Sequence, residues 1–425
     1  MEGELRRCRR RACRLLAAMR RTGHRVTRMF PTSRPATTRI VLVVVTIALA
    51  AAMLRSPIVA VAPVAPQVGA DLGVSAAALG LLTSIPVLAF ALCSPLAVAV
   101  VRRGGPDFAL AVGLLGAVVG CLIRSAGGFG TALVGTAVIG VFLTIGNVVV
   151  PVVIAREFPP HRVHVMTGVY TSAINVGTMT VTLATAPLAD VVGWRAAIAL
   201  WAAFGVAAVC TWVALLGFRD VCTPRREATP VRDADAAPRR SVLRAGSTWA
   251  LGAAFAGQAF SYYAMTAWLP TLLLDRGFGQ AAAGAIAALF QVAGIVGALL
   301  LPLLSRSSIL AGVLAVAIGW LTVPVGFLLA PDLWALWCVI GGAAQGGGLT
   351  VIFIMISALG GTQHEVTGRS GIVQGLGYAV AAIGPTVVGG LHELTGGWTA
   401  PLLTVTVAVV LFGTVGSAVA ARIRH

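Results

Sequence analysis

An arginine stands inside an apolar run of the sequence, where a membrane would make a permanent charge costly. Arg55 lies about fifteen residues along the run 40–62, roughly 22 Å from its start if the run is helical. Placing arginine in the hydrocarbon core costs from about 2.5 to above 10 kcal/mol, so something must offset that cost. Its guanidinium carries N–H donors in a planar fork that suits a small planar anion. Two interpretations are open: Arg55 binds or gates a solute, or it pairs with Asp190 or Glu393 or reaches the lipid headgroups.

Isolated amides and two tyrosines complete the set of residues that can hold a polar solute. An amide both donates and accepts hydrogen bonds, so it can bind a neutral or an anionic group. Two glutamines each have a tyrosine four residues later, which places each pair on one helical face. The same residue types also join helices to each other, so both roles are open for them. The candidates are Asn147, Asn175, Gln258, Tyr262, Gln291, Gln345, Gln374 and Tyr378.

A polar stripe runs along residues 164–188. Thr171, Asn175, Thr178, Thr182 and Thr185 follow each other at helical spacing, so they share one face. Such a face is costly against lipid and is therefore expected to contact protein or water. Helix–helix hydrogen bonding explains the threonines as well as transport does. Two aromatic residues of the next half, Tyr263 and Trp268, are expected to anchor the membrane interface.

The elements that must position these residues are membrane-spanning helices. Mean hydropathy is +0.93, and only 11% of the 425 residues are charged. Apolar runs of 18 or more residues recur, and each is long enough to cross a bilayer as a helix. Their sequences do not alternate as the strands of a membrane barrel do. We expect an all-α membrane protein with twelve spans, at 40–62, 76–100, 107–126, 130–154, 164–188, 194–217, 248–272, 281–303, 308–328, 332–356, 368–391 and 399–421.

The distribution of arginine gives an orientation. All 31 basic residues are arginine, and the net charge is +17. If the N-terminus is inside, 27 of these arginines fall in the tail, the inner loops and the C-terminal end. Three fall in outer loops, Arg124, Arg195 and Arg276. Cytoplasmic loops collect arginine, so both termini are expected in the cytoplasm of a multi-pass inner-membrane protein. The Arg-rich tail 1–39 is expected to lie near anionic lipid, and we expect no nucleic-acid partner.

The sequence has few residues that could bind a metal or a cofactor or catalyse a reaction. None of the seven cysteines forms a CxxC pair, and the four inside apolar runs are expected to be buried as small hydrophobic residues. Two histidines in residues 161–164 have no carboxylate cluster beside them, so they fit a basic loop better than a metal site. No span holds a histidine or an acid in the middle of its helix, although His164 stands at the start of 164–188. We therefore expect no cofactor, no metal and no enzymatic activity, and a monomer as the working state.

The chain repeats itself. Residues 218–246 are polar and carry three prolines, which predicts a cytoplasmic linker between an N-terminal half, 40–217, and a C-terminal half, 247–421. Duplicated six-helix halves with a solute site between them are typical of major facilitator transporters. Matching positions recur 204 residues apart, or 200 in one region. They are Pro66, Asp71, Gly73, Gly80, Arg102 and Gly193-Trp194 with Pro270, Asp275, Gly277, Gly284, Arg306 and Gly397-Trp398, and Thr167-Gly168 and Gly177 with Thr367-Gly368 and Gly377.

Longer segments of the chain carry more specific motifs. They are "LRSPIVAVAPVAPQVGADLGVS" (54–75), "TSIPVLAFALCSPLA" (83–97), "GNVVVPVVIAREFPPH" (146–161), "MTGVYTSAINVG" (166–177), "AWLPTLLLDRGF" (267–278), "ALFQVAGIVGALLLPLL" (288–304) and "GIVQGLGYAVAAIGPTVVGGLHELTGGW" (371–398). Over residues 40–420 the chain resembles one family of that fold, the cyanate permease and 2-nitroimidazole transporter family. The resemblance implies transport of a cyanate-like or nitroimidazole-like solute. The superfamily's acidic, glycine-rich loop after the second span is degraded here to "VVRRGGPD", around 101–107.

These observations favour secondary active or facilitated transport of a small polar, anionic, cyanate-like solute by alternating access. Arg55 would hold the charge of the solute, and the amides and tyrosines would complete the site. The alternative is an exporter of drug-like or nitroimidazole-like compounds. Proton-coupled exporters of this fold usually need the acidic loop and an acid in the first span, and both are missing here.

Overall fold

The structure, a computed structural model, describes residues 36–224, 239–360 and 363–423. Helices account for nearly all of these residues, and the described ranges contain no strand. Internal contacts separate the chain into Met1–Val41 and Leu42–His425. The architecture described below is that of Leu42–His425. Most of the predicted tail 1–39 and the centre of the predicted linker lie outside the described residues.

The N-terminal half is a series of helices broken by proline and glycine. Pro57 and Pro63 interrupt the first span, and Gly105 has left-handed backbone angles (φ 80°, ψ 163°) in the middle of a long helix, where the chain turns back. The helices are α2 (Ala36–Val59), η1 (Ala62–Val64), α3 (Ala65–Leu72), α4 (Ala76–Leu92), α5 (Ser94–Ser125), α6 (Phe129–Glu157), α7 (Pro160–Val192), α8 (Trp194–Leu200), α9 (Ala203–Leu216) and α10 (Phe218–Cys222).

The C-terminal half follows the same plan. A break at residues 382–383 divides one predicted span in two, and Pro385 stands at the start of the second piece, where its missing N–H costs nothing. The helices are α11 (Arg239–Arg244), α12 (Gly246–Asp275), α13 (Gln280–Ser307), α14 (Ile309–Leu329), η2 (Pro331–Leu333), α15 (Trp334–Ala358), α16 (Gln363–Ala381), α17 (Gly384–Thr395) and α18 (Thr399–Ala420).

The expectation of an all-helical membrane protein is confirmed. Each of the twelve predicted ranges lies mainly on helix. Among the described residues, nine helical stretches are long and apolar enough to cross a membrane. The other three ranges fall on α4, which has 17 residues, and on α7 and α12, which carry the polar residues singled out above. The expectation for the cysteines is partly wrong: Cys121 and Cys338 are buried, but Cys210 is exposed.

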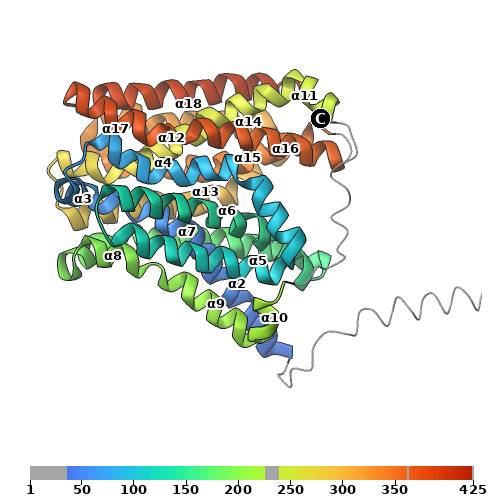
Figure 1. Cartoon of the computed structure of the whole chain (residues 1–425). Helices are drawn as coiled ribbons and strands as arrows, with labels where there is room; N and C mark the ends of the chain where they lie inside the picture. Colours follow the sequence, from blue (N-terminus) through green and yellow to red (C-terminus); the bar gives the residue numbers. More distant parts are fainter. Residues whose placement is uncertain (1–35, 225–238, 361–362, 424–425) are drawn as a thin grey trace, which may run out of the picture. The chain divides into compact units, whose positions relative to one another are not determined.

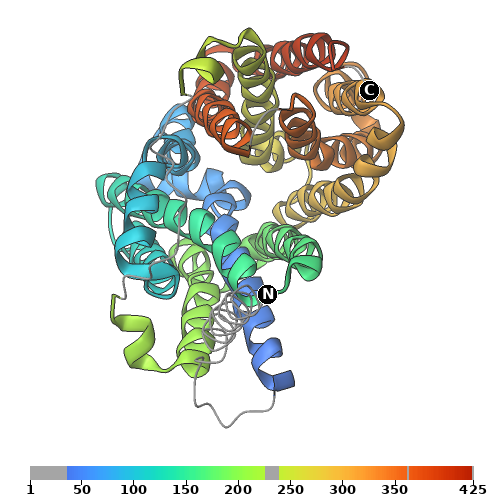
Figure 2. The ribbon, with the colours of Figure 1, turned by 90° about the vertical axis from the view of Figure 1, so that its right-hand side faces the viewer.

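The two halves pack against each other mainly through α4 and α7 of the N-terminal half, with further contacts from η1 to α12 and α13. α4 contacts α16 and α17, and α7 contacts α13. Figure 2 looks along the helices, with the blue-to-green helices on one side and the yellow-to-red helices on the other. In Figure 1, α10 and α11 lie at one end of this bundle, and α3 and α8 lie at the opposite end.

The end that carries α3 is closed by contacts between the halves. Gly80 of α4 lies so close to α17 that a methyl group on it would be 2.7 Å from backbone atoms of Pro385. Ser84 and Thr386 share a hydrogen bond of 3.1 Å beside it. The Gln67 amide donates to the Gln280 Oε1 at 2.9 Å. Backbone approach and neutral hydrogen bonds therefore seal this end.

The sequence repeat places equivalent residues in equivalent contacts. The Trp194 indole N–H donates to Asp71 at 3.3 Å, and that of Trp398 donates to Asp275 at 2.8 Å. In both pairs the two residues are 123 positions apart. Each half thus ties the end of its first span to the start of its last in the same way.

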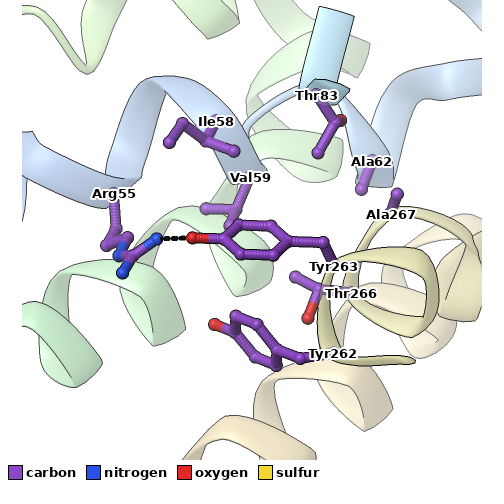
Figure 3. Close-up of a pocket in the computed structure, with 9 residues that line it drawn as sticks. All are labelled: Arg55, Ile58, Val59, Ala62, Thr83, Tyr262, Tyr263, Thr266 and Ala267. Carbon is purple, nitrogen blue, oxygen red and sulfur yellow. Dashed lines mark hydrogen bonds between the residues drawn. The ribbon is translucent and has the colours of Figure 1, made fainter. Parts of the chain in front are cut away.

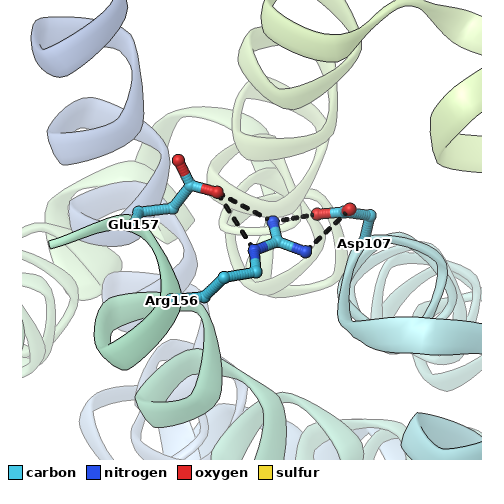
Figure 4. Close-up of polar contacts among 3 residues, drawn as sticks. All are labelled: Asp107, Arg156 and Glu157. Carbon is cyan, nitrogen blue, oxygen red and sulfur yellow. Dashed lines mark hydrogen bonds and ion pairs between the residues drawn. The ribbon is translucent and has the colours of Figure 1, made fainter. Parts of the chain in front are cut away.

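An ion-pair cluster joins α5, just after its break at Gly105, to the end of α6 (Figure 4). Arg156, near the end of α6, donates two hydrogen bonds to the Asp107 carboxylate, at 2.9 and 2.5 Å. A third, of 3.0 Å, goes to Glu157. The paired Arg156 and Asp107 side chains are only 17% and 22% exposed. The loop at 101–107 lacks most of the superfamily pattern, but its one acidic residue, Asp107, forms an ion pair with Arg156.

Replacing Asp107 with asparagine should lower the thermal stability of the protein. The change removes the charge from a bidentate, partly buried pair, and we expect a loss of about 1 kcal/mol in the free energy of unfolding. Thermal melting in detergent measures it. The control is Asp332→Asn, because Asp332 is exposed and makes no ion pair with the described residues. Equal melting temperatures for the two variants would contradict the prediction.

Candidate functional site

A cavity of about 240 Å³ lies between the two halves. Its wall comes from six helices, and it extends from Arg55 toward the end of the bundle opposite the sealed one, since its lining on α13 and α15 comes from the later parts of those helices. The lining combines one charge, several polar groups and four aromatic rings. It consists of Arg55, Thr171, Ser172, Ile174, Asn175, Phe255, Gln258, Ala259, Tyr262, Tyr263, Ile295, Ala298, Leu299, Gln345, Gly346, Leu349, Thr350 and Tyr378.

Arg55 is held among aromatic rings. Its Nη1 donates a hydrogen bond to the Tyr263 hydroxyl. The Cζ atom lies 5.7 Å from the centre of the Phe90 ring and 5.6 Å from that of Tyr263, within the range of cation–π attraction. No carboxylate of the described residues forms an ion pair with Arg55, so the pairing with Asp190 or Glu393, one of the two interpretations left open, is not formed. The charge is offset by rings, a phenol and the polar cavity.

A second, much smaller chamber lies on the far side of the Arg55–Tyr263 contact. It holds about 10 Å³, roughly the space of one water molecule. Figure 3 shows Arg55 pointing at the Tyr263 hydroxyl, with Thr83 and Thr266 among the surrounding residues. The Thr266 hydroxyl is buried and has no hydrogen-bond partner in the described part of the chain. Arg55, Tyr262 and Tyr263 line both spaces, so they form the wall between them.

Six of the nine predicted site residues come together around the cavity. They are Arg55, Asn175, Gln258, Tyr262, Gln345 and Tyr378. Glycines make room for two of the amides. A methyl group on Gly294 would lie 3.2 Å from the Gln345 Oε1, and one on Gly348 would collide with the Gln258 amide. The glycine-rich stretch of α15 thus packs closely on α13 and α12 and leaves space for these amides.

The other three predicted residues do not line the cavity. Gln291 is 3% exposed, and Gln374 donates to Ser370 one turn earlier on α16, at 2.9 Å. Asn147 is half-buried on α6, which contributes nothing to the cavity wall. Gln374 shares a face with Tyr378 as expected, but only the tyrosine reaches the cavity. These three amides are better placed for packing than for binding.

The polar stripe of α7 divides between the two roles that its sequence left open. Thr171 and Asn175 line the cavity, and the Asn175 amide also donates to the Thr171 carbonyl at 3.0 Å. Thr178, Thr182 and Thr185 are at most 5% exposed and donate to carbonyls of their own helix. The part of the stripe nearer the C-terminal end of α7 is therefore structural.

Two expectations for aromatic residues are wrong. Tyr263 and Trp268 are 3% and 4% exposed, and neither lies at a surface. Trp268 donates to the Pro385 carbonyl at 2.7 Å and supports the break before α17. Tyr263 is the partner of Arg55. The sequence gives only a weak signal for it, since Tyr263 follows Tyr262 directly and lies 100° further around the helix.

Arg124, expected in an outer loop, is also buried. Its side chain is 1% exposed and donates to the Pro57 carbonyl, at the point where α2 ends. A cation is favourable at the C-terminus of a helix, because the last carbonyls point toward it. Arg124 therefore stabilises the interruption that follows Arg55 in the first span.

The helical bundle, the two-halved packing and a polar cavity between the halves define a membrane transporter. The sequence matches the profile of the Major Facilitator Superfamily over residues 40–308, which is more than half of the chain. The protein belongs to this superfamily.

Curated relatives cover nearly the whole chain. An uncharacterised transporter of Bacillus subtilis (strain 168), YycB, is 32% identical over 375 residues, 85% of this chain and 89% of the relative. A 2-nitroimidazole transporter of Escherichia coli (strain K12) is 31% identical, covering 91% of this chain and 96% of the relative. The cyanate transport protein CynX of the same organism is 25% identical, covering 81% and 88%. The resemblance seen in the sequence is thus confirmed.

Among solved structures, a bacterial homologue of the human lysosomal transporter Spinster, inward-facing and unoccupied, has the same fold. Its TM-score is 0.68 at 17% identity, and the match covers 93% of this chain and 99% of that one. At this identity the likeness concerns the fold alone.

Proposed function

We propose that the protein transports a small polar, anionic solute of the cyanate kind across the cytoplasmic membrane by alternating access. Arg55 binds the negative charge. The amides of Asn175, Gln258 and Gln345 and the hydroxyls of Tyr262 and Tyr378 hold the rest of the solute.

One observation carries this proposal. Arg55 is half-buried, lines a polar cavity and forms no ion pair with a carboxylate among the described residues. A charge that a carboxylate already neutralised would not attract an anion, whereas Arg55 retains its full charge. Its donors form a fork that matches two oxygens of a planar group or one end of a linear anion. In this setting an anionic solute is the natural counter-ion.

The size of the cavity supports a small solute. About 240 Å³ is below the usual range for drug-sized ligands, which begins at roughly 300 Å³. Two relatives are named for small solutes, cyanate and 2-nitroimidazole. Both solutes present compact electronegative acceptors, a linear anion in one and a planar nitro group in the other.

The same structure supports a direction for the opening of the cavity. With 27 arginines on the inner side, the N-terminus, the linker and the C-terminus are cytoplasmic, and the end sealed by Gly80 and Pro385 is external. The cavity then faces the cytoplasm. Transport requires the α4–α17 and α7–α13 contacts to part while the opposite ends close.

A nitroimidazole-like exporter is the alternative, and the rings of the cavity favour it. Phe255, Tyr262 and Tyr378 offer apolar faces to a flat aromatic solute, and the Arg55 fork suits a nitro group. The two functions differ in the charge of the solute, which is an anion in the first and an uncharged aromatic compound in the second.

Uptake into proteoliposomes of purified protein tests the proposal. The panel is cyanate, acetate, nitrate and 2-nitroimidazole, with protein-free liposomes as the control. We expect at least one of the anions to enter at a saturable rate and the other anions to compete with it. Saturable movement of 2-nitroimidazole with no effect of any anion would overturn the proposal in favour of the exporter.

A further inference from the structure

Tyr263 occupies the position at which a solute must meet Arg55. It lies on α12 in the C-terminal half, and its hydroxyl accepts a hydrogen bond from Arg55 on α2 in the N-terminal half. Both residues line the large cavity and the small chamber, so their contact separates the two spaces (Figure 3). The hydrogen bond therefore joins the two halves at the end of the cavity that borders the small chamber.

The surroundings restrict how an anion can approach Arg55. The rings of Phe90 and Tyr263 both lie less than 6 Å from the guanidinium carbon. Phe90 is itself braced by Tyr378, at 5.9 Å between ring centres. Guanidinium donors point outward in the plane of the group, so an anion must bind at its edge. One of those edge donors, Nη1, is taken by the Tyr263 hydroxyl.

A phenol is a weaker partner for a guanidinium than an anion is. The Tyr263 hydroxyl is a neutral acceptor, whereas an anion adds the attraction between opposite charges and can accept from two neighbouring N–H groups at once. An anion that binds at the Nη1 edge of Arg55 therefore competes with Tyr263 for that edge. In the empty protein the hydroxyl satisfies a buried cation that would otherwise lack a partner on that side.

We propose that Tyr263 is the internal ligand which the transported anion replaces on Arg55. This inference rests on the proposed function. It makes Tyr263 a positioning and specificity residue: solutes unable to displace a phenol from Arg55 are rejected. It also links solute binding to the movement of the two halves. When the anion displaces the Tyr263 hydroxyl from Arg55, a hydrogen bond between the halves is lost, and the small chamber becomes continuous with the cavity.

The variant Tyr263→Phe tests the proposal, and Tyr262→Phe is its matched control. Tyr262 is the adjacent residue, lines the same two spaces and touches the Tyr263 ring, at 5.1 Å between centres, but Arg55 donates no hydrogen bond to it. Dissociation constants for cyanate, nitrate and acetate come from thermal shifts of the purified protein as a function of anion concentration. Initial and maximal uptake rates come from proteoliposomes.

We expect Tyr263→Phe to bind the transported anion about fivefold more tightly than wild type, because the anion no longer competes with a hydroxyl. Its maximal uptake rate should fall at least about threefold, because binding no longer breaks a contact between the halves. Tyr262→Phe should not tighten binding. Opposite changes in affinity and maximal rate are a result that a purely structural tyrosine would not give.

Three results would overturn the inference. Weaker binding by Tyr263→Phe would make the hydroxyl a direct ligand of the anion. Unchanged affinity with a lower melting temperature would make it structural. If no anion shifts the melting temperature of wild type or enters its liposomes, the proposed function fails, and the inference fails with it. This third result is seen in wild type, whereas the first two are seen only in Tyr263→Phe, so the two kinds of failure can be told apart.

Discussion

An Arg55→Gln variant should take up the transported anion at least about 100-fold more slowly than wild type at low solute concentration. Glutamine keeps a hydrogen-bond donor but has no charge to meet the solute. Losing the charged partner of a buried anion costs about 3 kcal/mol or more, which corresponds to at least a hundredfold in affinity. The initial uptake rate below saturation measures this loss directly.

Arg55→Lys separates charge from geometry. Lysine keeps the positive charge but lacks the planar fork, so we expect an intermediate loss of about tenfold. Melting temperatures of both variants check that the loss is not a failure to fold, since the contact with Tyr263 is also removed. Wild-type uptake by Arg55→Gln, or a fall in uptake that only parallels a fall in stability, would assign Arg55 a structural role.

A Gly80→Ala variant should fail to seal the end of the bundle that carries α3. The added methyl group would lie 2.7 Å from the backbone of Pro385 and from the Cα of Thr386, and backbone atoms cannot rotate away as a side chain does. Overpacking of this kind costs about 1–3 kcal/mol. That energy shifts an equilibrium between closed and open ends by about 5- to 150-fold. We expect uptake to fall at least tenfold.

Labelling shows whether the sealed end has opened. Ser84 is 6% exposed and hydrogen-bonds Thr386 within the seal, so a Ser84→Cys probe in a background without other cysteines reports on access from the sealed end. We expect a membrane-impermeant maleimide to react several-fold faster when Gly80→Ala is also present. Gly390→Ala is the control on the same pair of helices, because its methyl group would meet only the Ala77 side chain, at 3.5 Å. Equal labelling and uptake in both variants would show that the Gly80 contact does not set the closed state.

Most of the fold follows from the sequence because a bilayer leaves little choice. An apolar run of about 20 residues has to satisfy its backbone internally, so it becomes a helix. Pro57, Pro63 and Pro385 lie at or near interruptions of these helices, since proline lacks the N–H that continues them. The repeat of Asp71 and Asp275 also predicted equivalent positions, and both carboxylates accept from an indole.

The candidate site was harder to predict, because periodicity shows which residues share a face but not what that face meets. Gln345 and Gln374 look alike in sequence, yet one lines the cavity and the other donates to its own helix. Among partners within the protein, the sequence offered only the carboxylates of Asp190 and Glu393 for Arg55. A phenol from the other half, 208 positions away, takes that place.

The sequence alone identifies this protein as a helical membrane transporter in two repeated halves with an arginine in its first span. Hydrophobicity and charge act locally along the chain, so their pattern indicates the class of protein directly. Which polar residues meet depends on how the helices pack. Tyr262 and Tyr263 differ by one position and 100° of rotation, and packing between the halves makes only Tyr263 the partner of Arg55.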